Sequence, residues 1–100
     1  MVARIHIPDS QIGEFCKKHG VSELSLFGSV LRDDFGPASD VDVLVAFEPG
    51  RAIALDEWLD MLDELREMFG REVDLVERKR VTNPFRRHSI LTSRQVIYAT

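Results

Sequence analysis

The segment Asp40–Phe47 is the feature that most constrains how this chain can fold. Its sequence is Asp-Val-Asp-Val-Leu-Val-Ala-Phe, so three valines alternate with Asp40 and Asp42. Because successive side chains of a β-strand point to opposite faces, this alternation predicts a strand with the valines on one face and both carboxylates on the other. A valine face of this kind is typical of a central strand, because β-branched side chains fit a buried, pleated surface. We therefore expect a sheet with at least one covered face.

Hydrophobic periodicity predicts the elements around this strand. Apolar residues recur at three- and four-residue steps over 10–19 and 54–69, which predicts two amphipathic helices that end before Gly20 and Gly70. The other expected elements are strands at Leu24–Phe27, Glu72–Val76 and, at a sheet edge, Gln95–Tyr98, a helical turn at 29–33, and a helix over 84–92 that begins at Asn83-Pro84. This order predicts an α/β (α+β) fold, one mixed β-sheet with helices packed against it.

Length and composition limit the class of protein. We expect 100 residues, 44% of them apolar and 30% charged, to form one domain over 1–100 with a modest core. The longest apolar run, 43–47, is far below the ~18 residues that a membrane span requires, and the first residues lack a signal-peptide apolar stretch. We therefore expect a cytoplasmic protein without membrane contact. Cys16 is the one cysteine, so we expect it in the core rather than in a disulfide or zinc site.

Charge is distributed unevenly along the chain. Residues 1–77 contain all 17 acidic residues and 7 of the 13 basic ones, a formal charge of −10, whereas residues 78–100 contain six bases and no acid. An acidic body argues against a protein that coats nucleic acid, which would present a basic face to phosphate. The basic segment 78–94 is either a solvated surface or a site for an anion or an acidic protein.

A strand that ends in Gly28-Ser29 and opens a helical turn offers a candidate phosphate site. The first backbone N–H groups of a helix have no intrahelical partner, Gly28 permits close approach of an anion, and Ser29 adds a hydroxyl donor. Gly-Ser pairs are also ordinary turn residues, and that reading stays open for this fragment alone.

Asp40 and Asp42 form a candidate cation site. Unpaired carboxylates on a central strand cost several kcal/mol in order of magnitude unless a cation compensates them, and Mg²⁺ prefers such oxygen ligands. The alternative is a strand that begins at Val41, with Asp40 in a loop and Asp42 paired with an arginine.

Asp74 lies between apolar residues of another expected strand. If that strand is next to Asp40–Phe47, Asp74 joins the same cluster; the alternative is an ion pair with Arg71 or Arg78. Three acids that bind Mg²⁺ beside a phosphate site are suited to nucleophilic attack on a nucleotide phosphorus, because the metal activates the nucleophile and neutralises the leaving pyrophosphate.

The combined pattern is similar to a known family. Gly28-Ser29, ten intervening residues and then Asp40-x-Asp42, with Arg32 and Ser39 also in place, resembles the minimal nucleotidyltransferase (MNT) group of the DNA polymerase β-like superfamily. The resemblance implies a nucleotidyltransferase fold in which Gly28 and Ser29 bind the triphosphate of ATP. It also implies that Asp40, Asp42 and, from a later strand, Asp74 bind Mg²⁺. Arg32 either reaches a phosphate or pairs with Asp33 or Asp34, and Ser39 is expected to brace the Asp40 loop.

The resemblance also implies a partner. Single-domain members of this group resemble antitoxins encoded beside a HEPN-domain ribonuclease toxin, which they bind and modify by moving AMP from ATP to a tyrosine. We therefore expect an Mg²⁺-dependent antitoxin enzyme that works in a hetero-oligomer, with the partner completing the site and with no direct nucleic-acid binding. Two alternatives stay open: an antitoxin that neutralises its toxin by binding alone, and transfer of a nucleotide to a small-molecule hydroxyl.

Overall fold

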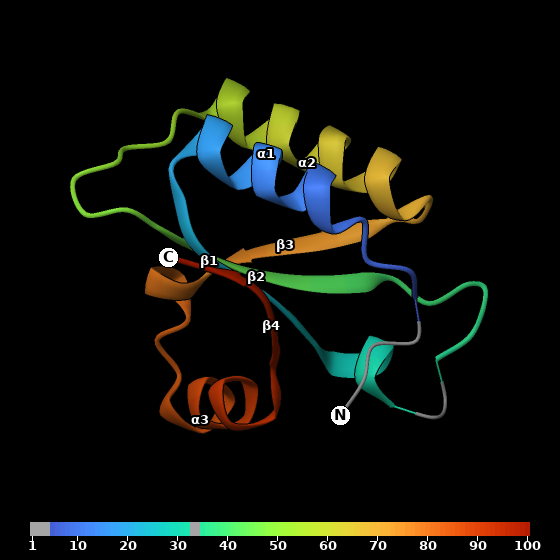
Figure 1. Cartoon of the computed structure of the whole chain (residues 1–100). Helices are drawn as coiled ribbons and strands as arrows, with labels where there is room; N and C mark the ends of the chain where they lie inside the picture. The colour runs from blue at the N-terminus through green and yellow to red at the C-terminus, as the bar shows by residue number, and fades with distance from the viewer. Residues whose placement is uncertain (1–4, 33–34) are drawn as a thin grey trace.

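The described part of the chain, residues 5–32 and 35–100 of a computed structural model, contains one mixed sheet with strand order β3-β2-β1-β4 (Figure 1). The strands are β1 (Val21–Phe27), β2 (Val41–Phe47), β3 (Val73–Glu77) and β4 (Gln95–Ala99). β1 pairs antiparallel with β2 and β4, and β2 pairs parallel with β3. The prediction that the Asp40–Phe47 region is central is confirmed, and so is the edge position of the last strand.

The helices cover both faces of this sheet. Their bounds are α1 (Asp9–His19), α2 (Leu55–Phe69) and α3 (Pro84–Ser93), with two short 3-10 helices, η1 (Gly28–Leu31) and η2 (Arg78–Arg80). α1 and α2 lie side by side on one face, and α3 lies on the opposite side of the sheet (Figure 1). The predicted mixed sheet with helices packed against it is confirmed.

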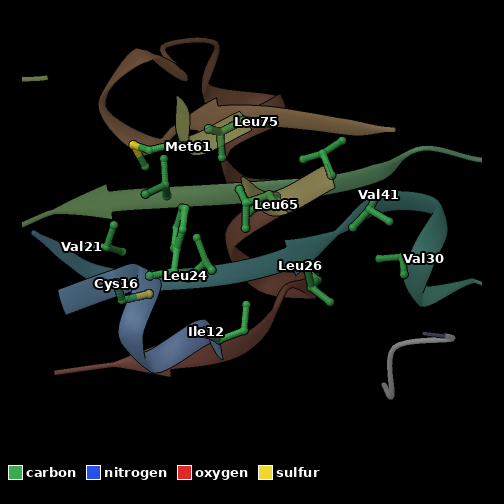
Figure 2. Packing of buried hydrophobic residues seen from close by; sticks show 14 of the residues in the cluster. Ile12, Cys16, Val21, Leu24, Leu26, Val30, Val41, Met61, Leu65 and Leu75 are labelled. Carbon is green, nitrogen blue, oxygen red and sulfur yellow. The ribbon is translucent and has the colours of Figure 1, made fainter. Parts of the chain in front are cut away.

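The larger core lies between the sheet and the helices α1 and α2. Figure 2 shows Ile12 and Cys16 of α1 and Met61 and Leu65 of α2 gathered around the side chains of the strands. All four are at most 1% exposed, and each large apolar side chain buried in this way contributes about 1.5–3 kcal/mol. Burial raises the pKa of the Cys16 thiol to about 12, so the predicted core cysteine is a thiol without nucleophilic character at neutral pH.

The two faces of β2 have different neighbours. Val41, Val43 and Val45 are fully buried in the core under α1 and α2. Leu44 belongs instead to a second cluster that includes Ile90 of α3. Because alternate residues share a face, Asp42 lies on the α3 side of the sheet together with Leu44. The predicted separation of valines from carboxylate is therefore found, and it puts the carboxylate on the less covered face.

Several predicted boundaries were wrong by one to three residues. The strand predicted at Leu24 begins at Val21, because the pairing of β1 with β2 continues as far as Val21, the register partner of Phe47. The strand predicted from Asp40 begins at Val41, because Asp40 follows a turn in which the Ser39 N–H donates to the Gly36 carbonyl (3.0 Å). The helical turn predicted at 29–33 is η1 (Gly28–Leu31), and residue 33 lies outside the described residues. The other bounds shift by at most one residue, and η2 was not predicted.

The predicted helix-ending signals are confirmed. Gly20 and Gly70 adopt left-handed conformations (φ 68° and 65°) directly after α1 and α2. The Asn83 side chain accepts from the backbone N–H groups of Phe85 (3.0 Å) and Arg86 (3.1 Å), so it caps α3. Within the described residues, none of these helices is both long enough and apolar enough to cross a membrane.

Candidate functional site

Asp40, Asp42 and Asp74 come together where β2 and β3 begin. Asp42 and Asp74 are direct register partners in the parallel β2–β3 pair, and neighbouring strands lie about 4.8 Å apart. Asp40 precedes β2 by one residue rather than lying within it, so this part of the alternative interpretation holds. Asp40 and Asp74 are exposed and Asp42 is half-buried. The structure therefore joins the three predicted carboxylates at one edge of the sheet.

The pKa of the Asp42 carboxyl is raised above its ordinary value. Burial raises the pKa of the Asp42 carboxyl, and the negative charges of Asp74 and Asp40 raise it further. A hydrogen bond from the Ser29 backbone N–H and the positive charge of Arg32 act in the opposite direction. Two further carboxylates thus act on the charge of Asp42, and a cation bound among the three would relieve that repulsion.

Gly28 and Ser29 lie against the same carboxylates. Phe27, the last residue of β1, is the register partner of Asp42, so the chain turns into η1 directly beside that side chain. Gly28 has a φ of 71°, and a Cβ at this position would overlap Asp42 Oδ2 and lie 3.2 Å from Asp42 Cγ. The Ser29 hydroxyl donates to the Asp40 carbonyl at 3.4 Å. The turn therefore lies directly beside the predicted carboxylates.

Arg32 directly follows η1 and is exposed. It is close enough to Asp42 to lower the pKa of that carboxyl, which places a cation at the rim of the site. The alternative pairing of Arg32 with Asp33 or Asp34 lies outside the described residues.

Arg71 is a residue that the sequence analysis did not assign to the site. Its Nη1 donates to the carbonyls of Gly36 (2.7 Å) and Ser39 (3.2 Å), and its guanidinium carbon lies 4.4 Å from the centre of the Phe35 ring. The Ser39 hydroxyl in turn accepts from the Gly36 N–H (3.1 Å), which confirms that Ser39 braces this loop. Arg71 thus fixes the turn that leads into Asp40. Its contacts span 35 residues of sequence, and no local pattern indicates them.

The alternative pairing of Asp74 with Arg71 or Arg78 is not found, because both arginines make other contacts. Arg71 binds backbone carbonyls of the 36–39 turn, and Arg78 lies 3.7 Å from Glu23. Asp74 therefore faces the site as a carboxylate exposed to solvent.

The donor chemistry of this site suits a hard divalent cation. The cluster offers carboxylate oxygens, which Mg²⁺ prefers, and their mutual repulsion favours binding of positive charge. Across residues 5–32 and 35–100, no three His, Cys, Asp or Glu side chains already have the spacing of metal ligands. The carboxylates are therefore neighbours that would have to draw together around an ion.

Known proteins are similar to this chain in sequence. The family model described as a nucleotidyltransferase domain matches residues 9–97. A candidate protein adenylyltransferase of Methanocaldococcus jannaschii is 32% identical over 89 residues, which is 81% of this chain and 89% of the relative. The protein adenylyltransferase MntA of Thermococcus cleftensis is 36% identical over 63 residues, 63% of this chain and 62% of the relative.

Solved structures share the fold. A candidate minimal nucleotidyltransferase has a TM-score of 0.71 and 31% identity, covering 87% of this chain and 86% of that one. A toxin–antitoxin structure with AMP-PNP has a TM-score of 0.72 at 17% identity, covering 94% and 75%. The complex of a tri-AMPylated Shewanella oneidensis HEPN toxin with an MNT antitoxin has a TM-score of 0.63 at 17% identity, covering 92% and 70%. The last two likenesses show the fold alone.

Proposed function

This chain belongs to the nucleotidyltransferase family, and from that premise we propose that it is an antitoxin that transfers AMP from ATP to a tyrosine of a cognate HEPN-domain ribonuclease toxin, with Mg²⁺. The observation that carries the proposal is the pairing of Asp42 with Asp74 beside the Gly28 turn. It is supported by relatives named as protein adenylyltransferases and by a fold neighbour that contains an AMPylated HEPN toxin.

In the proposed site, Asp40, Asp42 and Asp74 hold Mg²⁺, while Gly28, Ser29 and Arg32 bind the phosphates of ATP. Bound Mg²⁺ would activate the attacking oxygen and neutralise charge on the pyrophosphate. The positive φ of Gly28 supports this assignment, because only glycine fits between the turn and the Asp42 carboxylate. Arg32 is the cation next to that turn and suits the negative charge of a phosphate.

The proposed reaction is an in-line displacement. The tyrosine oxygen forms a bond to the α-phosphorus of ATP, and the bond from that phosphorus to the pyrophosphate oxygen breaks. The phenolic proton passes to the carboxylate of Asp74. Its exposure to solvent supports this role, because an acceptor on a separate molecule can reach it.

The acceptor is proposed to arrive on a partner chain in a hetero-oligomer. Asp40 and Asp74 are both exposed, so within the described residues the site is open on the side from which the hydroxyl approaches. A bound toxin would cover this side and exclude water from the phosphorus.

Intact-mass spectrometry tests the proposal directly. The purified protein is incubated with the toxin encoded beside it, Mg²⁺ and each nucleoside triphosphate in turn, and the toxin is weighed. We expect an added AMP mass with ATP and none after Asp40→Asn with Asp42→Asn. Peptide sequencing then identifies the acceptor. No added mass on the toxin with any nucleotide would refute the transfer reaction.

The same double variant separates the proposal from neutralisation by binding alone. If transfer protects the cell, Asp40→Asn with Asp42→Asn fails to protect cells from the toxin, although it still co-purifies with the toxin. Full protection by this variant, with no label moving from ATP to toxin, would favour a purely binding antitoxin.

A further inference from the structure

A cavity of about 310 Å³ lies between the Gly28 turn and α3. Gly28 and Arg32 line it from the side of η1, and Ser89 and Ser93 line it from α3. Its apolar walls are Phe27, Leu31 and Ile90, each less than 9% exposed. Through Gly28, the cavity adjoins the Asp42 carboxylate on the α3 face of the sheet. α3 is thus a second wall of the site, although its sequence shows no nucleotide-binding motif.

The polar groups of this cavity suit phosphate. Arg32 supplies a cation and the two serines supply hydroxyls, and none of the described residues that line the cavity is acidic. Arg86 precedes Ser89 by three residues, so it lies on the same side of α3 as Ser89. A nucleobase would instead need an open aromatic face, but Phe27 is 8% exposed and packed against Ile90 and Leu44.

Ser89 is the better donor of the two serines. The Ser93 hydroxyl already donates to the Ser89 carbonyl at 2.6 Å, so its proton is used within the helix. The described residues include no hydrogen-bond partner for the Ser89 hydroxyl, and Ser89 is exposed to solvent inside a cavity lined by Arg32. A phosphate oxygen is the strong acceptor that would complete this arrangement.

We infer that Ser89 of α3, with Arg32, binds the β- and γ-phosphates of the nucleotide opposite the Gly28 turn. The inference rests on the proposed function, because it assumes that the carboxylate cluster and the turn hold a triphosphate. It adds that α3 is part of the binding site for the leaving pyrophosphate and not only a cover for the sheet.

The test measures binding without turnover. Dissociation constants for AMP-PNP with Mg²⁺ are determined by titration calorimetry for wild type, Ser89→Ala and Ser89→Thr, and inorganic tripolyphosphate is measured as a competitor. A hydrogen bond to a charged acceptor predicts that Ser89→Ala weakens both ligands about tenfold. Ser89→Thr keeps the hydroxyl and should stay within about threefold of wild type. Thr92→Ala is the matched control, because Thr92 is an exposed α3 residue that does not line the cavity.

Each outcome decides between specific possibilities. Unchanged binding by Ser89→Ala, or weaker AMP-PNP binding with unchanged tripolyphosphate binding, would overturn the inference, the second result by assigning the cavity to the nucleoside. Equal losses in Ser89→Ala and Ser89→Thr would also overturn it, since they indicate a packing role. A wild type that binds AMP-PNP but transfers nothing to the toxin would refute the proposed function and leave this inference intact. A wild type that binds no nucleotide would overturn both.

Discussion

Asp42 is the residue at which stability and proposed activity oppose each other. Burial and two neighbouring carboxylates raise its pKa, so its charged form is disfavoured in the fold. A raised pKa stabilises the fold below the unfolded value of 3.8, and this contribution is lost as pH rises through the folded value. At neutral pH the charge of Asp42 therefore destabilises the protein without a cation, as is common for charged groups gathered for function.

Asp42→Asn should accordingly stabilise the metal-free protein at pH 7 while abolishing AMP transfer. Asparagine keeps the shape and an acceptor for the Ser29 N–H but removes the repelled charge. We expect a gain of about 0.5–1 kcal/mol, reduced by solvent screening, that disappears below pH 3.8. Urea unfolding at pH 7 and at a pH below 3.8 measures this gain in stability. Asp63→Asn, at an exposed position of α2, should change stability by less than about 0.5 kcal/mol. A variant less stable than wild type at pH 7 would contradict this account.

Gly28→Ala should damage both the fold and the site. Alanine at a φ of 71° costs about 1–2 kcal/mol, and its Cβ would overlap Asp42 Oδ2, so that the carboxylate must move. We expect a loss of about 2 kcal/mol and, from misplacement of Asp42, about 100-fold slower transfer. Gly13→Ala is the matched control: Gly13 lies within α1 with open space around it, so alanine should raise stability by about 0.5–1 kcal/mol. If Gly28→Ala transferred AMP at the wild-type rate, the close approach of the turn to Asp42 would not be needed for the proposed activity.

At the scale of the element, the loop before β2 is held in place by Arg71, the second residue after α2. Arg71 donates to two carbonyls of that loop and lies over the Phe35 ring, so β2 and the end of α2 are fixed together. The Val41 N–H also donates to the Glu72 carbonyl (3.0 Å), which continues the β2–β3 ladder to the edge of the site. The start of β2 is therefore held by long-range bonds rather than by its own sequence.

Arg71→Lys should loosen this loop without unfolding the protein. Lysine keeps the charge but loses the planar group that spans two carbonyls and stacks on Phe35. We expect about tenfold slower transfer and a higher Mg²⁺ requirement, with a stability loss of about 1 kcal/mol. Magnesium titrations of the transfer rate check this. Arg66→Lys, which affects exposed ion pairs with Asp63 and Glu72, should leave both quantities near wild type. An unchanged magnesium requirement in Arg71→Lys would exclude this positioning role.

The helices and strands show which features can be predicted from the sequence. Valine alternation predicted β2 and its faces, and apolar periodicity with Gly70 predicted α2, because both patterns are local. The resemblance carried by Gly28-Ser29 and Asp40-x-Asp42 implied that turn and carboxylates meet, and the antiparallel pairing of β1 with β2 brings them together in the structure. Asp74 was conditional on strand order, which alternation does not determine. Arg71 and Ser89 depend on contacts between distant segments and were therefore missed.

At the scale of the whole molecule, the two layers of helices differ in the size of the apolar cluster that they cover. The layer of α1 and α2 contains the larger apolar core, whereas α3 covers a small cluster and leaves room for the site. A polar contact also joins α1 to α2: the buried His19 has its Nδ1 3.0 Å from Glu57 Oε2 and its Nε2 3.0 Å from Glu64 Oε2. Arg51 Nη2 lies 2.6 Å from the same Glu57 oxygen. We call this group of His19, Glu57, Glu64 and Arg51 the clamp. It belongs to the layer of α1 and α2, on the face of the sheet opposite to Asp42, so it can be altered without touching the proposed chemistry.

The clamp makes the stability of the molecule sensitive to acid. The hydrogen bond from His19, and then that from Arg51, lower the pKa of Glu57 below its ordinary value of 4.5. A lowered pKa contributes stability that is present above 4.5 and is lost as pH falls through the folded value. Asp42 has the opposite sign, so of these two carboxylates it is Glu57 in the clamp, and not Asp42 in the site, whose contribution to stability is lost in acid.

Glu57→Gln should therefore flatten the decline of stability below pH 4.5 and lower stability at pH 7, because an amide cannot replace the carboxylate that His19 and Arg51 share. Urea midpoints between pH 3 and pH 7 give the profile. Glu67→Gln, on the exposed side of α2, should keep the wild-type slope. AMP transfer at pH 7 should be unchanged in both variants as long as they remain folded. If Glu57→Gln followed the wild-type pH profile, the acid sensitivity would have to come from carboxylates outside the α1–α2 layer.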